Sequence, residues 1–244
     1  MGALHRFYIP EPLWNESALL LQGEEAHHCR NVLRHAVGDQ IEVFQGRGVS
    51  AVARICELRK SEVELELVKR EKREPIRVSV TLAQALPKGK HMEFVVQKAT
   101  EIGVTRILPL VTERTVVRLE EEDKKREKWH RVALEACKQC GQNWLPELAP
   151  VETVPHFLAG DLPDWCLVAA LAPEAKRLRE LMGGKPADEM GSLALAVGPE
   201  GDFSPSELEA FREAKFDFLS LGPNVLRSET AAIYALSVVS QEFF

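Results

Sequence analysis

The chain has 244 residues, of which 45% are hydrophobic and 28% are charged, and its formal net charge is −6. This composition is that of an ordinary globular protein with room for one or two domains, and the acidic balance argues against indiscriminate binding to nucleic acid. No apolar run is long enough to span a membrane, and residues 1–10 lack the apolar core of a signal peptide. Five cysteines without a regular framework of spacings are typical of a reduced, cytoplasmic protein.

Two of the cysteines, Cys137 and Cys140, form a Cys-x-x-Cys spacing. A structural zinc site needs four ligands, and no second ligand pair stands nearby in the sequence. We therefore expect neither a metal site nor redox chemistry.

Residues 1–72 have the pattern of a small β-barrel or sandwich. The clearest strand is 61–68, where apolar residues alternate with glutamates, as they do in half-buried antiparallel strands. Strands over 40–45 and 49–58 and a helix over 24–33 are also predicted. The charged run that ends at Pro75 is interpreted as the linker to a second domain.

After this run, strands and helices alternate. The strands are short, nearly continuous apolar runs, which is typical of buried parallel strands; they are predicted over 78–85, 106–110, 165–171, 193–197 and 216–221. Helices are predicted over 91–102, 123–139 and 229–244, with another beginning at the capping box Ser204-Pro205-Ser206-Glu207. The pattern predicts an α/β domain with a parallel sheet.

Two glycine-marked loops carry the strongest functional signal: 197–203 (VGPEGDF) and 221–232 (LGPNVLRSETAA). Each follows a predicted strand and opens a helix. Two such loops at the carboxyl edge of a parallel sheet can form the walls of one ligand crevice, because glycine lets the backbone approach a ligand closely. Neither loop has the spacing of a dinucleotide-binding fold or the ending of a P-loop. The residues alone therefore leave the ligand open.

Five blocks resemble, in order, the ribosomal small-subunit methyltransferase E family of the knotted SPOUT methyltransferases. They are residues 5–9 (HRFYI), 27–34 (HHCRNVLR) with Gly38-Asp39, 88–104 (KGKHMEFVVQKATEIGV), 198–201 (GPEG) and 225–231 (VLRSETA). The resemblance covers essentially the whole chain. It has departures: Lys138 and Gln142 break an acidic and basic pattern that the family commonly shows, and Asp202 stands where a second glycine is usual.

The resemblance implies a PUA-like RNA-binding β-barrel domain over 1–72. A SPOUT methyltransferase domain over 73–244 follows, with a C-terminal deep trefoil knot. It also implies a homodimer, S-adenosylmethionine (SAM) as methyl donor, and methylation of N3 of a uridine in the decoding region of 16S rRNA, within the 30S subunit. The alternative is a catalytically silent RNA-binding or ribosome-assembly protein of the same fold. Intact Gly198, Glu200, Arg227 and Glu229 favour the enzyme.

The resemblance also implies roles for single residues. Glu200 is expected to accept the uracil N3 proton or to orient the base; the alternative is a carboxylate that stabilises a helix N-terminus. Arg227, whose forked guanidinium suits a carbonyl or phosphate, is expected to act in catalysis; the alternative is an ion pair with Glu229. The residues expected near SAM, chiefly through backbone groups, are Leu171, Gly198, Pro199, Gly201, Leu221, Gly222 and Leu226. Those expected to contact RNA are Arg6, Arg30, Arg34 and Lys88, for which the alternative is an ordinary surface or loop role.

Overall fold

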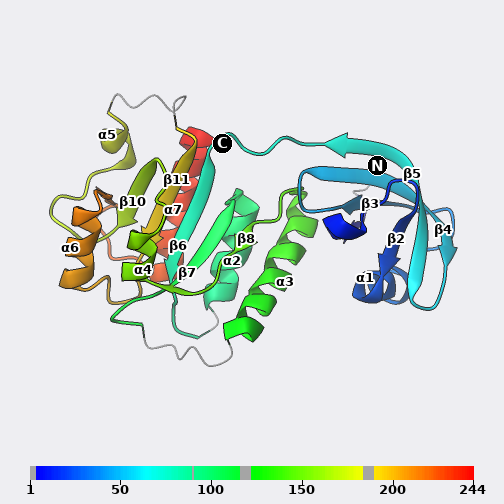
Figure 1. Cartoon of the computed structure of the whole chain (residues 1–244), viewed down its shortest axis with the longest axis horizontal. Coiled ribbons are helices and arrows are strands. Elements are labelled where there is room, and N and C mark those ends of the chain that lie inside the picture. The colour runs from blue at the N-terminus through cyan, green and yellow to red at the C-terminus, as the bar shows by residue number, and fades with distance from the viewer. Residues whose placement is uncertain (1–3, 90, 116–121, 184–189) are drawn as a thin grey trace. The chain divides into compact units, whose positions relative to one another are not determined.

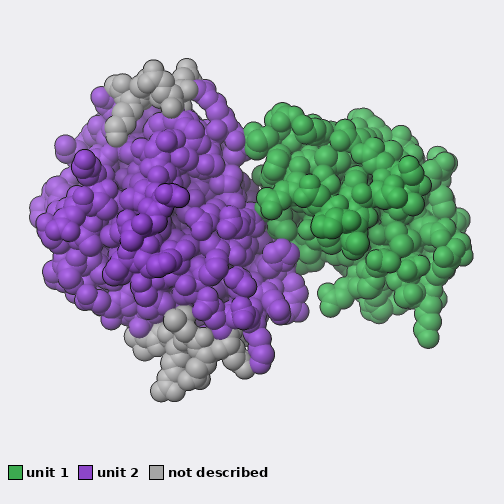
Figure 2. Space-filling view, in the orientation of Figure 1, with its two compact units in different colours: residues 1–75, 134–145 green, residues 76–133, 146–244 purple. Residues whose placement is uncertain are grey.

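The computed structural model describes residues 4–89, 91–115, 122–183 and 190–244. The chain forms two compact units, coloured separately in Figure 2. The first comprises residues 1–75 and 134–145, and the second comprises 76–133 and 146–244. The boundary that the sequence suggests, after residue 72, assigns 134–145 to the second domain, whereas this segment packs within the first unit.

The first unit is built on a five-stranded sheet with the order β1-β3-β4-β5-β2. The strands are β1 (Arg6–Tyr8), β2 (Leu19–Gln22), β3 (Gln40–Phe44), β4 (Val49–Leu58) and β5 (Glu62–Lys72). Strand β1 runs parallel to β3, and the other pairs are antiparallel. The register between β4 and β5 shifts at two points; such bulges bend a strand and increase its twist.

The charged run of this unit is not the simple linker that the sequence suggests. Its first residues continue β5, and Lys72 pairs with Val49 of β4. Arg70 forms an exposed ion pair with Glu16 at 2.6 Å. The long charged side chains therefore extend into solvent while the backbone remains part of the sheet.

The predicted helix over 24–33 is split in two. It begins as α1 (Gly23–His27) and continues as a π-helical turn, η2 (His28–Val32). Arg34 follows with a φ of 55°, a left-handed conformation that is uncommon for a residue with a side chain. The unit also contains a short 3-10 turn, η1 (Glu11–Leu13).

The second unit contains a sheet with the order β12-β10-β11-β6-β7-β8, and β9 also pairs with β7. Its strands are β6 (Ser79–Ala85), β7 (Arg106–Val111), β8 (Glu147–Leu148), β9 (Glu152–Thr153), β10 (Trp165–Ala169), β11 (Ser192–Val197) and β12 (Asp217–Leu219). All of these pairs are parallel. The predicted α/β architecture with a parallel sheet is confirmed.

Helices cover both faces of this sheet. The helices of this unit are α2 (His91–Ile102), α4 (Val154–Ala159), α5 (Leu178–Met182), α6 (Pro205–Glu213) and α7 (Ser228–Phe243), while α3 (Glu122–Cys140) begins in this unit and ends in the 134–145 segment of the first. Helix α7, red in Figure 1, packs on α2 and along β6 and β11. Ala194 and Ala196 of β11 belong to the core that contains Phe157 of α4 and Phe211 of α6. Because successive residues of a strand point to opposite faces, α7 lies on the face that the intervening residues of β11 occupy.

Within the described residues, no helix is long and apolar enough to cross a membrane. Nor do His, Cys, Asp and Glu side chains gather there in a group of three or more that could hold a metal ion. Of the Cys-x-x-Cys pair, Cys137 is buried, and burial raises the pKa of its thiol to about 12. A protonated, buried thiol is a poor nucleophile.

Candidate functional site

A cavity of about 570 Å³ lies at the carboxyl edge of the parallel sheet. Its walls are the loops that follow β10, β11 and β12, three neighbouring strands of the sheet. Ligands of α/β proteins characteristically bind at this edge. The glycine pattern of the sequence identified the second and third of these loops, whereas only the family resemblance pointed to the first, through Leu171.

The loop after β10 contributes an apolar wall. Leu171 lines the cavity with 62% of its surface exposed. Its backbone N–H donates to Oδ2 of Asp202, in the neighbouring loop, at 3.0 Å. A large apolar side chain held open to solvent beside a cavity is available to pack on a ligand.

The loop after β11 is shaped by a close approach of side chains to its glycine. A Cβ at Gly198 would lie 3.2 Å from Asp202 Oδ1 and 3.2 Å from the Phe203 ring. Asp202 itself has a φ of 61° and accepts the Phe203 N–H at 2.8 Å. The loop then ends in a full capping box between Ser204 and Glu207, which starts α6. The backbone of this loop is therefore fixed at both ends.

Glu200 lies in the same loop and lines the cavity. One of its carboxylate oxygens accepts the Lys88 backbone N–H at 3.0 Å, and the other has no partner among the described residues. Lys88 is exposed, but its side chain does not line the cavity. The bond ties the segment after β6 to the loop after β11.

The loop after β12 closes the cavity. Gly222 has a φ of 109°, with open space where a Cβ would stand, so glycine serves the backbone conformation here. Val225 is 74% exposed and Leu226 is half-buried; both line the cavity. Ser228, the first residue of α7, donates through its hydroxyl to the Gly198 carbonyl at 2.6 Å. This bond joins the second and third loops.

The seven residues predicted to lie near a cofactor all line this cavity, as does Glu200. Arg227 does not line it, although its neighbours Leu226 and Ser228 do. Arg227 is exposed, and its side chain has no hydrogen-bond or ion-pair partner among the described residues. The suggested ion pair between Arg227 and Glu229 is not found among the described residues. Oε1 of Glu229 instead lies 3.3 Å from Nδ1 of His91.

Several residues that lie at the cavity or bond to its walls were assigned no role at the site by the sequence analysis. Ser220, Asn224 and Ser228 bring polar side chains to its wall, and Asp202 bonds to the loop that carries Leu171. Fully buried Gln84, at the end of β6, donates to the Ser228 hydroxyl at 2.9 Å. A lone glutamine in a run of apolar residues was the available signal, because a buried amide needs partners.

In the first unit, the Arg6 side chain is bonded within the protein, whereas an RNA contact was predicted for it. Its guanidinium donates to the Cys137 carbonyl at 2.7 Å, to the Gln142 carbonyl at 3.3 Å and to Asn143 Oδ1. Its Nε lies 3.2 Å from Glu42 Oε2 without forming a hydrogen bond, and the side chain is 7% exposed. Burial lowers the pKa of Arg6, and Glu42 opposes that shift. The residue holds the 134–145 segment in place.

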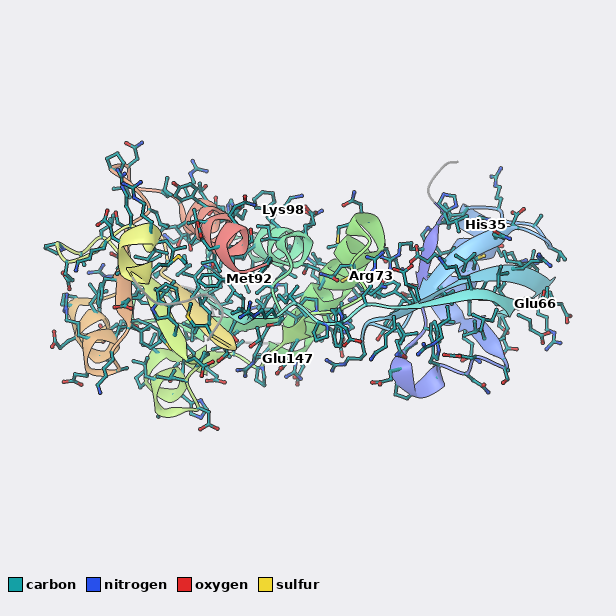
Figure 3. All side chains as sticks on the ribbon, turned by 90° about the horizontal axis from the view of Figure 1, so that it is seen from above. His35, Glu66, Arg73, Met92, Lys98 and Glu147 are labelled. Atoms are coloured by element: carbon teal, nitrogen blue, oxygen red, sulfur yellow. The ribbon has the colours of Figure 1, made fainter. Side chains whose placement is uncertain are left out.

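Arg30 and Arg34 are both exposed on this unit. Arg30 donates to the Arg59 carbonyl at 3.2 Å. Beside Arg34, His35 (labelled in Figure 3) lies 2.9 Å from His5 and 3.1 Å from Asp39 Oδ2. The predicted contacts at Arg30 and Arg34 therefore have the exposure that binding to phosphates requires.

Two departures from the family pattern have local explanations. Lys138 is nearly buried, and it pairs with Glu25 and, at 2.8 Å, with Glu135. Gln142 accepts the backbone N–H groups of Asn143 and Trp144 through its side-chain oxygen. Both residues organise the 134–145 segment.

The chain matches the model of an RNA methyltransferase domain over residues 73–240 and that of an RNA methyltransferase PUA domain over residues 21–68. It is 33% identical over 231 residues to ribosomal RNA small subunit methyltransferase E of Bacillus subtilis, an alignment that spans 91% of this chain and 89% of that protein. It is 31% identical to the protein of the same name from Aquifex aeolicus, over 97% of this chain and 99% of that one.

Two solved structures are also similar. A Legionella pneumophila protein, solved in complex with the cofactor SAM, is 35% identical over 98% of both chains with a TM-score of 0.89. The small subunit methyltransferase E of Neisseria gonorrhoeae, solved bound to S-adenosylmethionine, is 31% identical with a TM-score of 0.86, over 98% of this chain and 97% of that one. These similarities confirm the resemblance predicted from the sequence, and the chain belongs to the ribosomal RNA small subunit methyltransferase E family.

Proposed function

We propose that this protein transfers the methyl group of SAM to N3 of a uridine in the decoding region of 16S rRNA, within the 30S subunit. The observation that carries the proposal is the cavity where three loops meet at the carboxyl edge of the parallel sheet. The chain's family membership supports the reaction class, and the relatives solved with SAM support the cofactor.

The cavity fits SAM in size and chemistry. Its volume, about 570 Å³, lies within the range of about 300–1,000 Å³ typical of small-molecule sites. Leu171, Val225 and Leu226 offer apolar surface for an adenine ring, and the glycine-rich loops offer backbone groups for its polar edge. Ser220, Asn224 and Asp202 add polar side chains suited to ribose hydroxyls and an amino-acid moiety.

SAM supplies a methyl group already activated by its sulfonium, so the protein's task is to orient the reactants and to manage a proton. Uracil N3 carries a proton that must leave before the nitrogen can attack. Glu200 lines the cavity, and its carboxylate oxygen without a partner among the described residues can accept this proton or orient the base. The Arg227 guanidinium, which has no hydrogen-bond or ion-pair partner among the described residues, stands next to residues of that wall and can stabilise negative charge on the uracil oxygens.

We also propose the deep trefoil knot of the SPOUT fold for residues 73–244. Strand β12 hydrogen-bonds to β10, and on its other flank Lys176 and Leu219 form a parallel bridge. The chain then returns through α7 to β11 and β6, in the centre of the sheet. This path supports a threaded chain, which an experimental backbone trace can test.

The protein is further proposed to act as a homodimer, with residues 1–72 serving as the PUA-like RNA-binding domain. Phe94 on α2 is 46% exposed and Tyr234 on α7 is 48% exposed, and these two helices pack on each other. Exposed aromatic side chains of this kind favour burial against a second copy. Light scattering that finds only monomer at micromolar concentration would reject the dimer.

The proposed function is tested by binding and by chemistry together. SAM should raise the melting temperature of the purified protein, because a ligand that binds only the folded state stabilises it. Mass spectrometry of 16S rRNA from a deletion strain should show loss of one N3-methyluridine, restored with the gene. Binding of rRNA without any methyl transfer would identify the catalytically silent alternative.

Replacing Asp202 with glycine should weaken SAM binding about three- to tenfold with little loss of thermal stability. The change removes the acceptor that holds Leu171 N–H, at a cost typical of one or two hydrogen bonds, while glycine relieves the positive φ. Calorimetry and a melting curve measure the two effects. Asparagine tolerates this φ and keeps one acceptor oxygen. The SAM affinity of Asp202→Asn should therefore lie between those of Asp202→Gly and the wild type. An Asp202→Gly variant with wild-type affinity would contradict a role for this contact.

Replacing Arg30 with glutamine and Arg34 with asparagine should weaken binding to 30S subunits. It should also make the plot of log affinity against log salt shallower by about one to two units, because each phosphate contact releases counterions. Asparagine suits the left-handed backbone at residue 34. Arg54→Gln, an exposed arginine on β4 of the same unit, is the control. An unchanged salt dependence in the double variant would reject the predicted contacts.

A further inference from the structure

A glutamine lies buried in the centre of the parallel sheet, where apolar residues surround it. Gln84 is 0% exposed, at the carboxyl end of β6, beside Val197 of β11. Its Nε2 donates to the Ala85 carbonyl at 2.8 Å and to the Ser228 hydroxyl at 2.9 Å. Its Oε1 has no partner within the described part of the chain. Burying an amide that is only partly satisfied is costly, so packing alone does not explain this residue.

The direction of each hydrogen bond follows from the chemistry of the atoms. The Ala85 carbonyl can only accept, which fixes the amide with its nitrogen toward Ala85 and Ser228. The Gly198 carbonyl can also only accept, so the Ser228 proton points to it, at 2.6 Å. The result is a one-way chain from Gln84 through Ser228 to Gly198. Bonds in such a chain strengthen one another.

This series of hydrogen bonds runs from β6 to the candidate site. Ser228 and Gly198 both line the cavity, whereas Gln84 does not. Gly198 begins the loop after β11, and Ser228 follows directly on Arg227 at the start of α7. A residue of a third element, the central strand β6, is thus bonded to the serine that joins these two walls.

We propose that Gln84 is a positioning residue of the SAM site, acting through Ser228 to hold the Gly198 and Leu226–Ser228 walls at the spacing that the cofactor requires. The assignment rests on the proposed function, because it takes the cavity to be the SAM site. Its consequence is that a side chain outside the cavity sets cofactor affinity.

The test is SAM binding by calorimetry to the full-length protein and to Gln84→Met, which keeps the length of the side chain but cannot donate. Affinity should fall about three- to tenfold, the loss of roughly one hydrogen bond's net worth. The turnover number at saturating SAM should change less than the KM for SAM. Thr100→Val is the matched control: Thr100 is a buried polar residue of α2 that bonds to Val96 and does not line the cavity.

The Ser228 variants show whether the effect passes through the hydroxyl. Ser228→Ala should weaken SAM binding at least as much as Gln84→Met, and Ser228→Thr should restore affinity to within about twofold. Adding Gln84→Met to Ser228→Ala should cause no further loss, because both changes break one chain. Equal, additive losses from the two changes would overturn the assignment. If Gln84→Met does not fold, the comparison of alanine with threonine at Ser228 decides.

Two other outcomes distinguish a failure of this inference from a failure of the proposed function on which it rests. A lowered melting temperature with unchanged SAM affinity in Gln84→Met would make Gln84 a purely structural residue and overturn the assignment, leaving the proposed function intact. A wild-type protein that does not bind SAM would overturn the proposed function, and the positioning role with it.

Discussion

Arg227→Ala is expected to slow methyl transfer about 30- to 1000-fold while SAM affinity stays within about threefold of wild type. The slowing corresponds to the roughly 2–4 kcal/mol that a charge-assisted contact to a developing anion supplies. Arg227 is exposed and is the N-cap residue of α7, and its side chain has no hydrogen-bond or ion-pair partner among the described residues, so truncating that side chain breaks no such bond there. Its effect should therefore appear in the chemical step.

The physical reason is the charge that appears on uracil during the reaction. Once N3 has lost its proton, negative charge spreads onto the two carbonyl oxygens beside it. A guanidinium aimed at those oxygens interacts more strongly with the transition state than with neutral uridine, and only such a difference accelerates the reaction. Arg227 adjoins Leu226 and Ser228, which line the cavity, so its side chain can reach the reacting base without occupying the cofactor site.

Single-turnover methyl transfer on 30S subunits, measured beside SAM affinity by calorimetry, tests this prediction. The matched control is Arg177→Ala, because Arg177 is the exposed N-cap of α5 with nearly the same backbone angles, φ −67° against −64°. Arg227→Lys keeps the charge without the fork and should recover part of the rate. Unchanged turnover in folded Arg227→Ala would reject the catalytic role. A loss explained wholly by weaker SAM binding would make Arg227 a structural residue of the loop.

The sequence was informative wherever function depends on local backbone pattern. The apolar runs predicted the parallel sheet, and glycine after each run marked two of the loops that form the cavity. Gly222 illustrates the reason: its φ of 109° is a local requirement that almost only glycine meets. The seven residues predicted near the cofactor line one cavity because strand ends in a parallel sheet share an edge.

The sequence was uninformative where a side chain's partner lies far along the chain. Gln84 and Ser228 are 144 positions apart, and no local pattern joins them. Arg6 and Cys137 are 131 positions apart. An arginine at the end of a short strand has the same local signature whether it faces RNA or a buried carbonyl, so the pattern could not distinguish the two. The short elements α4, α5, β8 and β9 were missed because so few residues establish no period.

The 134–145 segment has a practical consequence for separating the domains. Cys137 and Asn143 are 0% exposed, and they contact Arg6 and Ser50 of the first unit. A fragment that begins near Pro75 would carry these residues without their partners. We therefore expect such a fragment to fold poorly, and the functions of the two units are better separated by point substitutions in the full chain.

Arg6→Ala should lower the free energy of unfolding of the first unit by about 3 kcal/mol, the cost typical of removing one member of a buried, bonded charge network. The substitution leaves the Asn143 Oδ1 atom and the Glu42 carboxylate without their cationic partner. It also removes the contact between the guanidinium and the Phe44 ring, whose centroid lies 4.6 Å away. Arg54→Ala, which breaks an exposed pair with Glu66 at 3.5 Å, should cost less than about 1 kcal/mol.

Urea denaturation followed by tryptophan fluorescence measures the effect, because Trp144 belongs to the affected segment and donates to the Arg73 carbonyl at 3.1 Å. If Arg6 holds the fold, both Arg6→Ala and Arg6→Lys should be destabilised, because a single ammonium cannot reproduce the forked bonds to three acceptors. Binding of 30S subunits at temperatures where the variant remains folded should stay near wild type. A stable Arg6→Ala variant that binds 30S subunits weakly, with an affinity that depends less on salt, would show instead that Arg6 contacts RNA.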